Sequence, residues 1–149
     1  MMVSTKGRYA LTVMLDLARQ DPNKYISLRE VSERQDISMK YLESIIATLN
    51  RAGIVRSLRG KGGGYKLNRA PKDCSVAEIL QLTEGSLAPV YCLEPGAGCI
   101  RSSSCITFPM WQHLDRMIDA YLSQISIEDL LQGRLPQTDS QEPSQAEQK

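Results

Sequence analysis

The stretch that decides the fold is residues 27–68, which read SLREVSERQDISMKYLESIIATLNRAGIVRSLRGKGGGYKLN. It opens with Ser27-Leu28-Arg29-Glu30, the spacing of a capping box, in which a hydroxyl and a carboxylate satisfy backbone N–H groups reciprocally. This predicts a short helix over Leu28–Gln35. The tight connection Asp36-Ile37-Ser38 then leads into another helix over Met39–Ala52, for which Ser38 can be the N-cap.

The helix over 39–52 is amphipathic and is followed by a predicted hairpin. Its apolar residues at helical spacing are Leu42, Ile45, Ile46 and Leu49. Gly53 stands where a left-handed C-terminal cap belongs. Two β-like runs, Ile54–Leu58 and Tyr65–Asn68, flank the tip Arg59-Gly60-Lys61-Gly62-Gly63-Gly64.

Helix, tight turn, helix and a hairpin with a basic tip form the order of a winged helix-turn-helix. The predicted fold class is therefore mainly α with a small β-hairpin wing, extended by a long C-terminal helix. A helix of this kind fits the major groove of DNA, with its first turns facing base edges. The residues predicted to contact double-stranded DNA from the helix and the wing are Ser38, Lys40, Tyr41, Glu43, Arg59, Lys61 and Gly62.

Two of these assignments have alternatives. Glu43 is an acid among bases, which suits either acceptance of a hydrogen bond from cytosine N4 or an interaction with the helix dipole. The glycine-rich tip resembles a phosphate loop only superficially, because Tyr65-Lys66-Leu67 follows it instead of Ser or Thr and a helix. A tip that approaches DNA, with Arg59 or Lys61 in a narrow minor groove, is favoured.

The net charge of +1 hides an asymmetry. Residues 1–72 hold 14 Lys/Arg against 6 Asp/Glu, a net charge of +8, whereas residues 73–149 hold 4 against 11, a net charge of −7. A basic half beside an acidic half indicates a polyanion-binding module joined to a regulatory or assembly module. The predicted division is a DNA-binding domain over 1–72, a cysteine loop and dimerisation helix over 73–135, and a disordered tail over 136–149.

Outside this stretch, four further helices are expected. The first runs from Ser4 or Thr5 to Arg19, and a capping box of Ser75 and Glu78 opens another that extends to about Thr83. A Gly/Ser/Pro-rich segment over 85–104 precedes a long helix over 109–124, and a short helix begins at Ser126. The long helix has an apolar stripe made of Trp111, Leu114, Ile118, Leu122 and Ile125, which predicts a homodimer.

Four cysteines and no export signal argue against a disulfide framework and for a cytoplasmic protein. No apolar run reaches the roughly 18 residues that a membrane span needs. Cys92 and Cys99 lie in the irregular segment and Cys105 directly follows it, so that the three thiolates can wrap one metal centre. Unligated reduced thiols are the alternative for these three. Cys74, at a helix start, is interpreted as structural.

Three motifs of the chain are Ser4-Thr5-Lys6-Gly7-Arg8-Tyr9-Ala10, Tyr41-Leu42-Glu43 and Arg59-Gly60-Lys61-Gly62-Gly63-Gly64-Tyr65. Read together, they resemble a bacterial family of winged helix-turn-helix regulators that includes IscR, NsrR and CymR. The resemblance covers about residues 1–131. It implies a homodimeric repressor or activator that binds a pseudo-palindromic operator, and it adds Thr5, Lys6 and Arg8 to the DNA-binding residues.

The resemblance also implies an iron–sulfur cluster, of the 2Fe–2S or 4Fe–4S type, held by Cys92, Cys99 and Cys105. IscR-like and NsrR-like members carry three cysteines in this loop, whereas CymR-like members lack them. This chain departs from the IscR pattern at the fourth ligand, since Phe108 stands where IscR has histidine. The fourth ligand is then His113, a residue of the partner chain or an exchangeable group; Arg8, at a position from which some relatives ligate, cannot ligate.

The functional prediction is a DNA-binding regulator that senses cluster status, redox stress or nitric oxide. A second hypothesis keeps DNA binding without a cluster, as a thiol-redox switch or a CymR-like metabolic repressor. An enzyme, such as a thiol oxidoreductase, is disfavoured: the chain has no Cys-x-x-Cys, and its single histidine has no evident catalytic partner.

Overall fold

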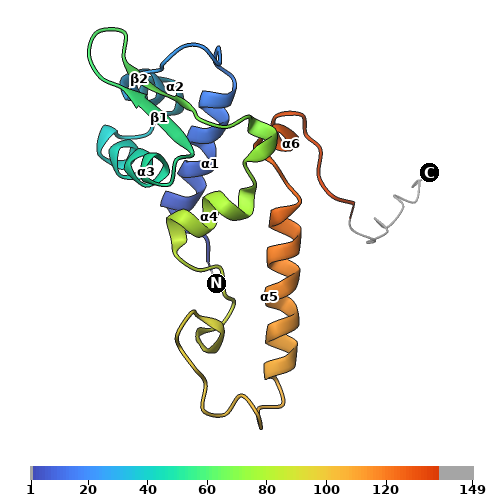
Figure 1. The fold of residues 1–149 in the computed structure, drawn as a ribbon. Coiled ribbons are helices and arrows are strands. Elements are labelled where there is room, and N and C mark those ends of the chain that lie inside the picture. The colour runs from blue at the N-terminus through green and yellow to red at the C-terminus, as the bar shows by residue number, and fades with distance from the viewer. Residues whose placement is uncertain (1, 138–149) are drawn as a thin grey trace, which may run out of the picture.

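The computed structural model describes residues 2–137, so the predicted disorder of the tail falls, from residue 138 onward, outside the described residues. The elements are α1 (Thr5–Ala18), α2 (Leu28–Gln35), α3 (Met39–Arg51), β1 (Val55–Leu58), β2 (Gly64–Leu67), α4 (Val76–Glu84), α5 (Phe108–Ser123) and α6 (Ile127–Leu131). Short 3₁₀ turns occur at Pro71–Asp73 and Tyr91–Leu93. Figure 1 shows a helical body that carries the β1–β2 hairpin, with α5 projecting from it as a long arm.

The predicted winged helix-turn-helix is confirmed in the body. β1 and β2 pair antiparallel from Val55 with Leu67 to Leu58 with Gly64. Ile26 adds an isolated bridge to Tyr65, so the segment before α2 also pairs with the start of β2. The main core joins α1, α2, α3, α4 and the start of the hairpin through buried apolar residues, among them Val13, Met14, Val31, Leu42, Ile45, Leu49, Val55 and Ile79.

The predicted caps are confirmed in two places and need correction in a third. Ser27 and Glu30 form a complete capping box on α2. Gly53 has φ of 75°, and the N–H of Ile54 reaches back to the carbonyl of Leu49, so α3 ends in a left-handed cap. At α4, Ser75 accepts from the backbone N–H of Glu78, but the Glu78 carboxylate does not return the bond.

The Glu78 carboxylate instead accepts a hydrogen bond from the Arg69 guanidinium, at 2.7 Å. Arg69 lies in the segment that leads from the wing to α4. Because donor and acceptor are both ionised, this bond competes effectively with the N-cap amide for the carboxylate, and the predicted box is only half formed. This ion pair therefore ties the end of the wing to the first turn of α4.

The apolar stripe predicted on α5 divides into two faces. Ile118, Leu122 and the following Ile125 pack within the chain. Their neighbours are the buried side chains of Val76 and Leu80 in α4 and of Leu87 in the loop after it. The apolar residues left exposed on α5 are Met110, Leu114, Met117 and Tyr121. Ile125 is thus buried within the chain and is not available to a partner, whereas Ile118 and Leu122 are only half-buried by these contacts.

None of the helices within residues 2–137 combines the length and the apolar character that crossing a membrane requires.

Candidate nucleic-acid interface and cysteine loop

The face of α3 that points away from the core carries polar and small side chains. Leu42, Ile45, Ile46 and Leu49 are buried, as predicted. The opposite face exposes Lys40, Glu43, Ser44, Ala47 and Arg51. This stripe of residues spaced three and four apart is what a helix lying in the major groove would present to base edges.

Ser44, Ala47 and Met39 belong to this exposed surface although sequence reasoning did not single them out. Met39 is 40% exposed at the start of α3. Small or apolar side chains give no chemical motif by themselves. The helical period that identified the buried face does predict Ser44 and Ala47, since they fall on the side opposite Leu42 and Ile45. Met39 is exposed as the first residue of the helix.

Glu43 is free to face a ligand. It is exposed, and within residues 2–137 it forms no ion pair or side-chain hydrogen bond. It is the fifth residue of α3, beyond the first turn, where interactions with the helix dipole become weak. The geometry thus disfavours the helix-dipole alternative.

Two residues predicted to contact DNA at the start of α3 also stabilise the fold. Ser38 caps the helix, because its side chain accepts a hydrogen bond from the backbone N–H of Tyr41. The ring of Tyr41 packs edge-on against Tyr9 of α1, with centroids 5.6 Å apart. This contact fixes the start of α3 against α1, and it leaves Tyr41 45% exposed.

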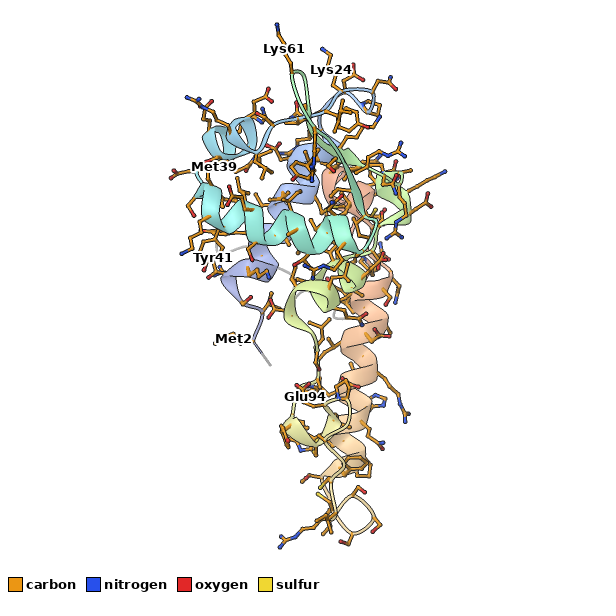
Figure 2. All side chains as sticks on the ribbon, turned by 60° about the vertical axis from the view of Figure 1, so that its left-hand side comes forward. Met2, Lys24, Met39, Tyr41, Lys61 and Glu94 are labelled. Carbon is orange, nitrogen blue, oxygen red and sulfur yellow. The ribbon has the colours of Figure 1, made fainter. Side chains whose placement is uncertain are left out.

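The wing tip is exposed and contains backbone conformations that favour glycine. Arg59 and Lys61 are exposed, and Gly60 and Gly62 have φ of 92° and 75°. A Cβ added at Gly60 or Gly62 would meet no atom within 4 Å, so this part of the tip has open space around it. In Figure 2, Lys61 at this tip and Met39 on α3 lie at the end of the molecule opposite Glu94, which marks the cysteine loop.

The first turns of α1 bring the other predicted cations beside α3. Arg8 is exposed, and its guanidinium donates to the Thr5 hydroxyl at 3.3 Å. Thr5 and Lys6 are half-buried. Because Tyr9 contacts Tyr41, this part of α1 adjoins the start of α3.

The cysteine loop (residues 86–107) connects α4 to α5 beside the arm (Figure 1). Cys92, Cys99 and Cys105 are reduced and half-buried in it, whereas Cys74 is reduced and fully buried in the body. A hydrogen bond with the Thr107 side chain, at 3.4 Å, and bonds from the backbone lower the pKa of the Cys105 thiol. Burial raises the pKa of Cys74. The structure therefore separates the loop thiols from Cys74, as the sequence predicted.

The donor set suits an iron–sulfur cluster chemically, because three accessible thiols share one irregular loop and none forms a disulfide. The structure does not gather them: across residues 2–137, no three His, Cys, Asp or Glu side chains form a group that could hold a metal ion. His113 is exposed on α5. The three thiols are thus a fitting set of ligands on a loop that would have to draw together around a cluster.

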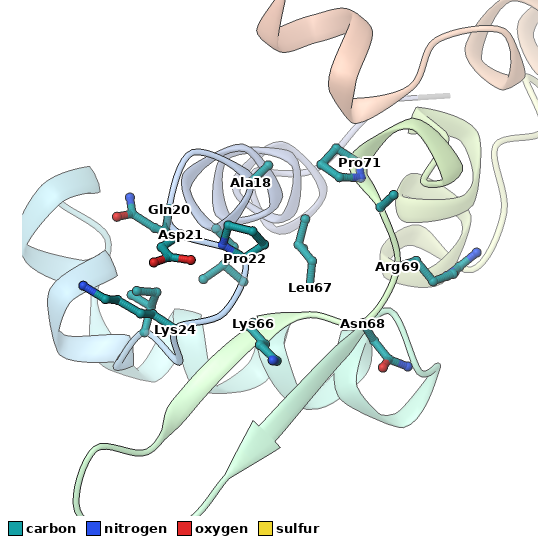
Figure 3. Close-up of a pocket in the computed structure, with 13 residues that line it drawn as sticks. Ala18, Gln20, Asp21, Pro22, Lys24, Lys66, Leu67, Asn68, Arg69 and Pro71 are labelled. Atoms are coloured by element: carbon teal, nitrogen blue, oxygen red, sulfur yellow. The ribbon is translucent and has the colours of Figure 1, made fainter.

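A pocket of about 380 Å³ lies between the end of α1 and β2 (Figure 3). Its apolar lining includes Leu67 and Pro71, and its cations are Lys24, Lys66 and Arg69. Two of these cations already have partners: Lys66 lies 4.8 Å from the centroid of the Tyr25 ring, and Arg69 pairs with Glu78. The pocket is better explained as a gap behind the wing than as an anion site.

Comparison with known proteins agrees with this architecture. The Rrf2 family model, described as an iron-dependent transcriptional regulator, matches residues 3–133. The regulator IscR of Photorhabdus laumondii is 37% identical over 134 residues, which is 90% of this chain and 81% of that protein.

Two solved structures are similar over most of the chain. T. potens IscR is 36% identical with a TM-score of 0.71, covering 89% of this chain and 88% of that one. CymR, the global cysteine regulator of B. subtilis, is 30% identical with a TM-score of 0.69, covering 89% of this chain and 98% of its own. These relatives are regulators rather than enzymes. The chain belongs to the Rrf2 family of winged-helix transcriptional regulators.

Proposed function

We propose that the chain is a homodimeric, DNA-binding regulator whose operator binding depends on an iron–sulfur cluster held by Cys92, Cys99 and Cys105. The observation that carries this proposal is the set of three reduced, half-buried cysteines on the one irregular loop between the DNA-binding body and the α5 arm. The similarity to IscR over most of the chain supports it.

The DNA-binding surface in this proposal consists of α3, the wing tip and the start of α1. Lys40 and Glu43 read the major groove from α3, and Arg59 and Lys61 contact phosphates or the minor groove from the wing. Gly62 lets the tip approach closely. The remaining contributors are Ser38, Tyr41, Thr5, Lys6 and Arg8.

The dimer in this proposal forms through the exposed apolar face of α5. Met110, Leu114, Met117 and Tyr121 lie three or four residues apart, so they share one side of the helix. Water makes such a contiguous apolar face unfavourable on an arm that projects from the body. A two-fold axis through this face would separate the two α3 helices of the dimer by about one DNA turn or a multiple of one turn. The operator would then be pseudo-palindromic.

The cluster would supply a redox- and ligand-sensitive centre, and the chain supplies thiolates and a pliable backbone. The fourth position is open to His113, to a partner residue or to an exchangeable group. Ordering the Gly/Ser-rich loop costs conformational entropy that a cluster would offset. Loss of the cluster would release the three thiolates, and the loop between α4 and α5 would change its arrangement.

Anaerobic purification followed by absorption spectroscopy and iron and sulfide analysis tests the proposal. The parent protein should be coloured, and replacing Cys92, Cys99 or Cys105 by Ala should remove the cluster and leave a folded apo-protein. Cys74→Ala is the matched control, because this thiol is buried in the body, and it should retain the cluster. A colourless parent, or a triple loop variant that still binds iron and sulfide, would overturn the assignment and favour a cluster-free regulator.

A further inference from the structure

The first turn of α1 is capped by a residue from another helix. Ser4 is the N-cap, and its Oγ accepts from the backbone N–H of Gly7 at 3.1 Å. In a complete capping box, the residue at the Gly7 position would return a bond from its side chain to the N-cap N–H. Glycine has no side chain, and the missing acceptor comes from Glu84, whose Oε1 accepts from Ser4 N at 3.1 Å and from Ser4 Oγ at 2.6 Å.

Gly7 and Glu84 fit each other sterically. Gly7 is buried, and a Cβ at this position would overlap the Oε1 atom of Glu84. The other complete boxes described in residues 2–137 are local: Ser27 pairs with Glu30 on α2, and Ser126 pairs with Asp129 on α6. The cap of α1 differs because its acceptor lies 80 residues away from Ser4 in the sequence.

Glu84 also occupies the junction between the DNA-binding body and the cysteine loop. It is the last residue of α4, and Gly85, with φ of 78°, turns the chain directly into the loop that contains Cys92. α4 is held to the arm as well, through a hydrogen bond from Gln81 to Asp119 at 3.3 Å. A rearrangement of the loop therefore acts first on the turn of α4 that carries Glu84.

We propose that Glu84 is a positioning residue that caps α1 from α4 and so makes the first turn of α1 responsive to the state of the cysteine loop. The inference rests on the proposed function, in which Thr5, Lys6 and Arg8 on that turn are among the DNA contacts and the loop is the sensor. When the loop shifts the end of α4, the Ser4–Glu84 bonds weaken, the first turn of α1 frays, and operator affinity falls.

The first experiment measures the cap itself by amide hydrogen exchange at Gly7 and Arg8, whose N–H groups bond to Ser4 Oγ and to the Ser4 carbonyl. Glu84→Ala should accelerate this exchange about fivefold, the equilibrium effect of losing one cap. Glu84→Gln keeps an acceptor oxygen and should restore most of the protection. Glu30→Ala is the matched control, because it breaks a local box on α2 and should leave Gly7 and Arg8 unchanged.

The same variants are compared for affinity toward a DNA duplex selected by the parent protein from a random-sequence pool. Glu84→Ala should bind it about five- to tenfold more weakly than the parent, and Glu84→Gln should bind it nearly as well as the parent. Unchanged exchange at Gly7 and Arg8 in Glu84→Ala, or unchanged affinity in a parent that does bind DNA, would overturn the proposal.

The second experiment tests the coupling, and it does not depend on a cluster. The loop is perturbed either by cluster loading or, in the cluster-free protein, by alkylation of the loop thiols with iodoacetamide, from which the buried Cys74 is protected. In the parent, perturbation should change exchange at Gly7 and Arg8 at least about threefold, a part of the full effect of the cap.

The double variant Gly7→Glu/Glu84→Ala moves the carboxylate from α4 to α1 at constant net charge, so its capping box is local. It should keep the cap and lose the response to the loop. The inference would be overturned if exchange at Gly7 and Arg8 in the double variant responded to the loop as strongly as in the parent. It would also be overturned if the parent responded to neither perturbation. A response to alkylation in a chain that binds no cluster would support the inference and refute the proposed cluster.

Discussion

Within residues 2–137, Asp16 is the charged residue that is buried in the core of the body, with 2% of its surface exposed. It lies on α1 and accepts two hydrogen bonds from the Arg34 guanidinium of α2, at 2.8 and 3.0 Å, and one from the Gln35 amide at 2.7 Å. Burial by itself would raise the pKa of Asp16, but these hydrogen bonds and the positive charges of Arg34 and Arg19 outweigh it and lower the pKa below 3.8. The carboxylate thus links α1 to α2, the first helix of the helix-turn-helix.

We expect Asp16→Asn to reduce the free energy of unfolding by about 2 kcal/mol near neutral pH, less than for a fully buried pair because Arg34 is partly exposed. A carboxylate with a lowered folded pKa stabilises the protein above its unfolded pKa and loses that contribution as pH falls through the folded value. The difference between parent and variant should therefore shrink below about pH 4. Urea unfolding at several pH values measures it, and a pH-independent difference would contradict the role of the charge.

At the scale of elements, the wing requires glycine where its tip meets β2, at Gly63 and Gly64, and tolerates a side chain at Gly60. Gly64 has φ of 145°, and a Cβ there would overlap the backbone carbonyl of Ile26. Gly60 at the tip also has positive φ but has no neighbour that a Cβ would meet. The start of β2 is thus held by backbone contact, since Ile26 and Tyr65 exchange hydrogen bonds there at 2.8 Å.

Gly64→Ala should consequently destabilise the protein by about 3 kcal/mol, because backbone strain adds to the loss of the Ile26–Tyr65 bridge. Gly60→Ala should cost about 1 kcal/mol, the penalty of a left-handed residue without a clash. Chemical denaturation of the two variants gives the comparison. Equal losses would show that the close approach to Ile26 is not what requires glycine.

The recognition helix and the wing should differ in how they act on DNA. Arg59→Ala removes an exposed cation and should weaken binding to all sequences, with the salt dependence of log K reduced by about one. Glu43→Ala should instead relax the discrimination among operator variants and leave non-specific binding nearly unchanged. Binding titrations over a salt series with single-base operator variants separate the two. An unchanged ranking of operators in Glu43→Ala would remove Glu43 from base recognition.

For the whole molecule, the arm determines assembly. Met117 lies on the exposed apolar face of α5, 56% exposed. A charge there would have to be buried without a partner in the proposed dimer, so Met117→Glu should dissociate it and abolish tight operator binding. Ser123→Glu places the same charge on an exposed residue away from this face and serves as the control. Light scattering should give the mass of two chains for the parent and the control, and of one chain for Met117→Glu.

Local sequence signals predicted the body of this protein well. The helices α2 and α3, the turn between them and the hairpin follow from capping residues, apolar spacing and glycines, all of which act within a few residues. The bounds of α2 agree with the predicted range Leu28–Gln35. The exposure of Lys40 and Glu43 follows from the helical period of α3, and that of Arg59 and Lys61 follows from their place in a glycine-rich turn.

Other features depended on contacts between distant segments. Glu78 fits a local capping box by sequence, but Arg69 lies close enough in space to compete for its carboxylate. The stripe on α5 is continuous by spacing, and only the packing of α4 shows that Ile118 is used internally and Met117 is not. A helical period identifies apolar positions, but it does not identify which neighbour each of them will meet.

The sequence by itself therefore determined the winged helix-turn-helix, the basic surface and the separation of three loop cysteines from Cys74, because each depends on residue type and on spacing along the chain. Only the tertiary structure decided that Asp16 is buried against Arg34, that one face of α5 remains free, and that Glu84 caps α1 in place of a side chain at Gly7. These are matters of which surfaces meet once the chain is folded, and no local preference encodes the distance between Ser4 and Glu84.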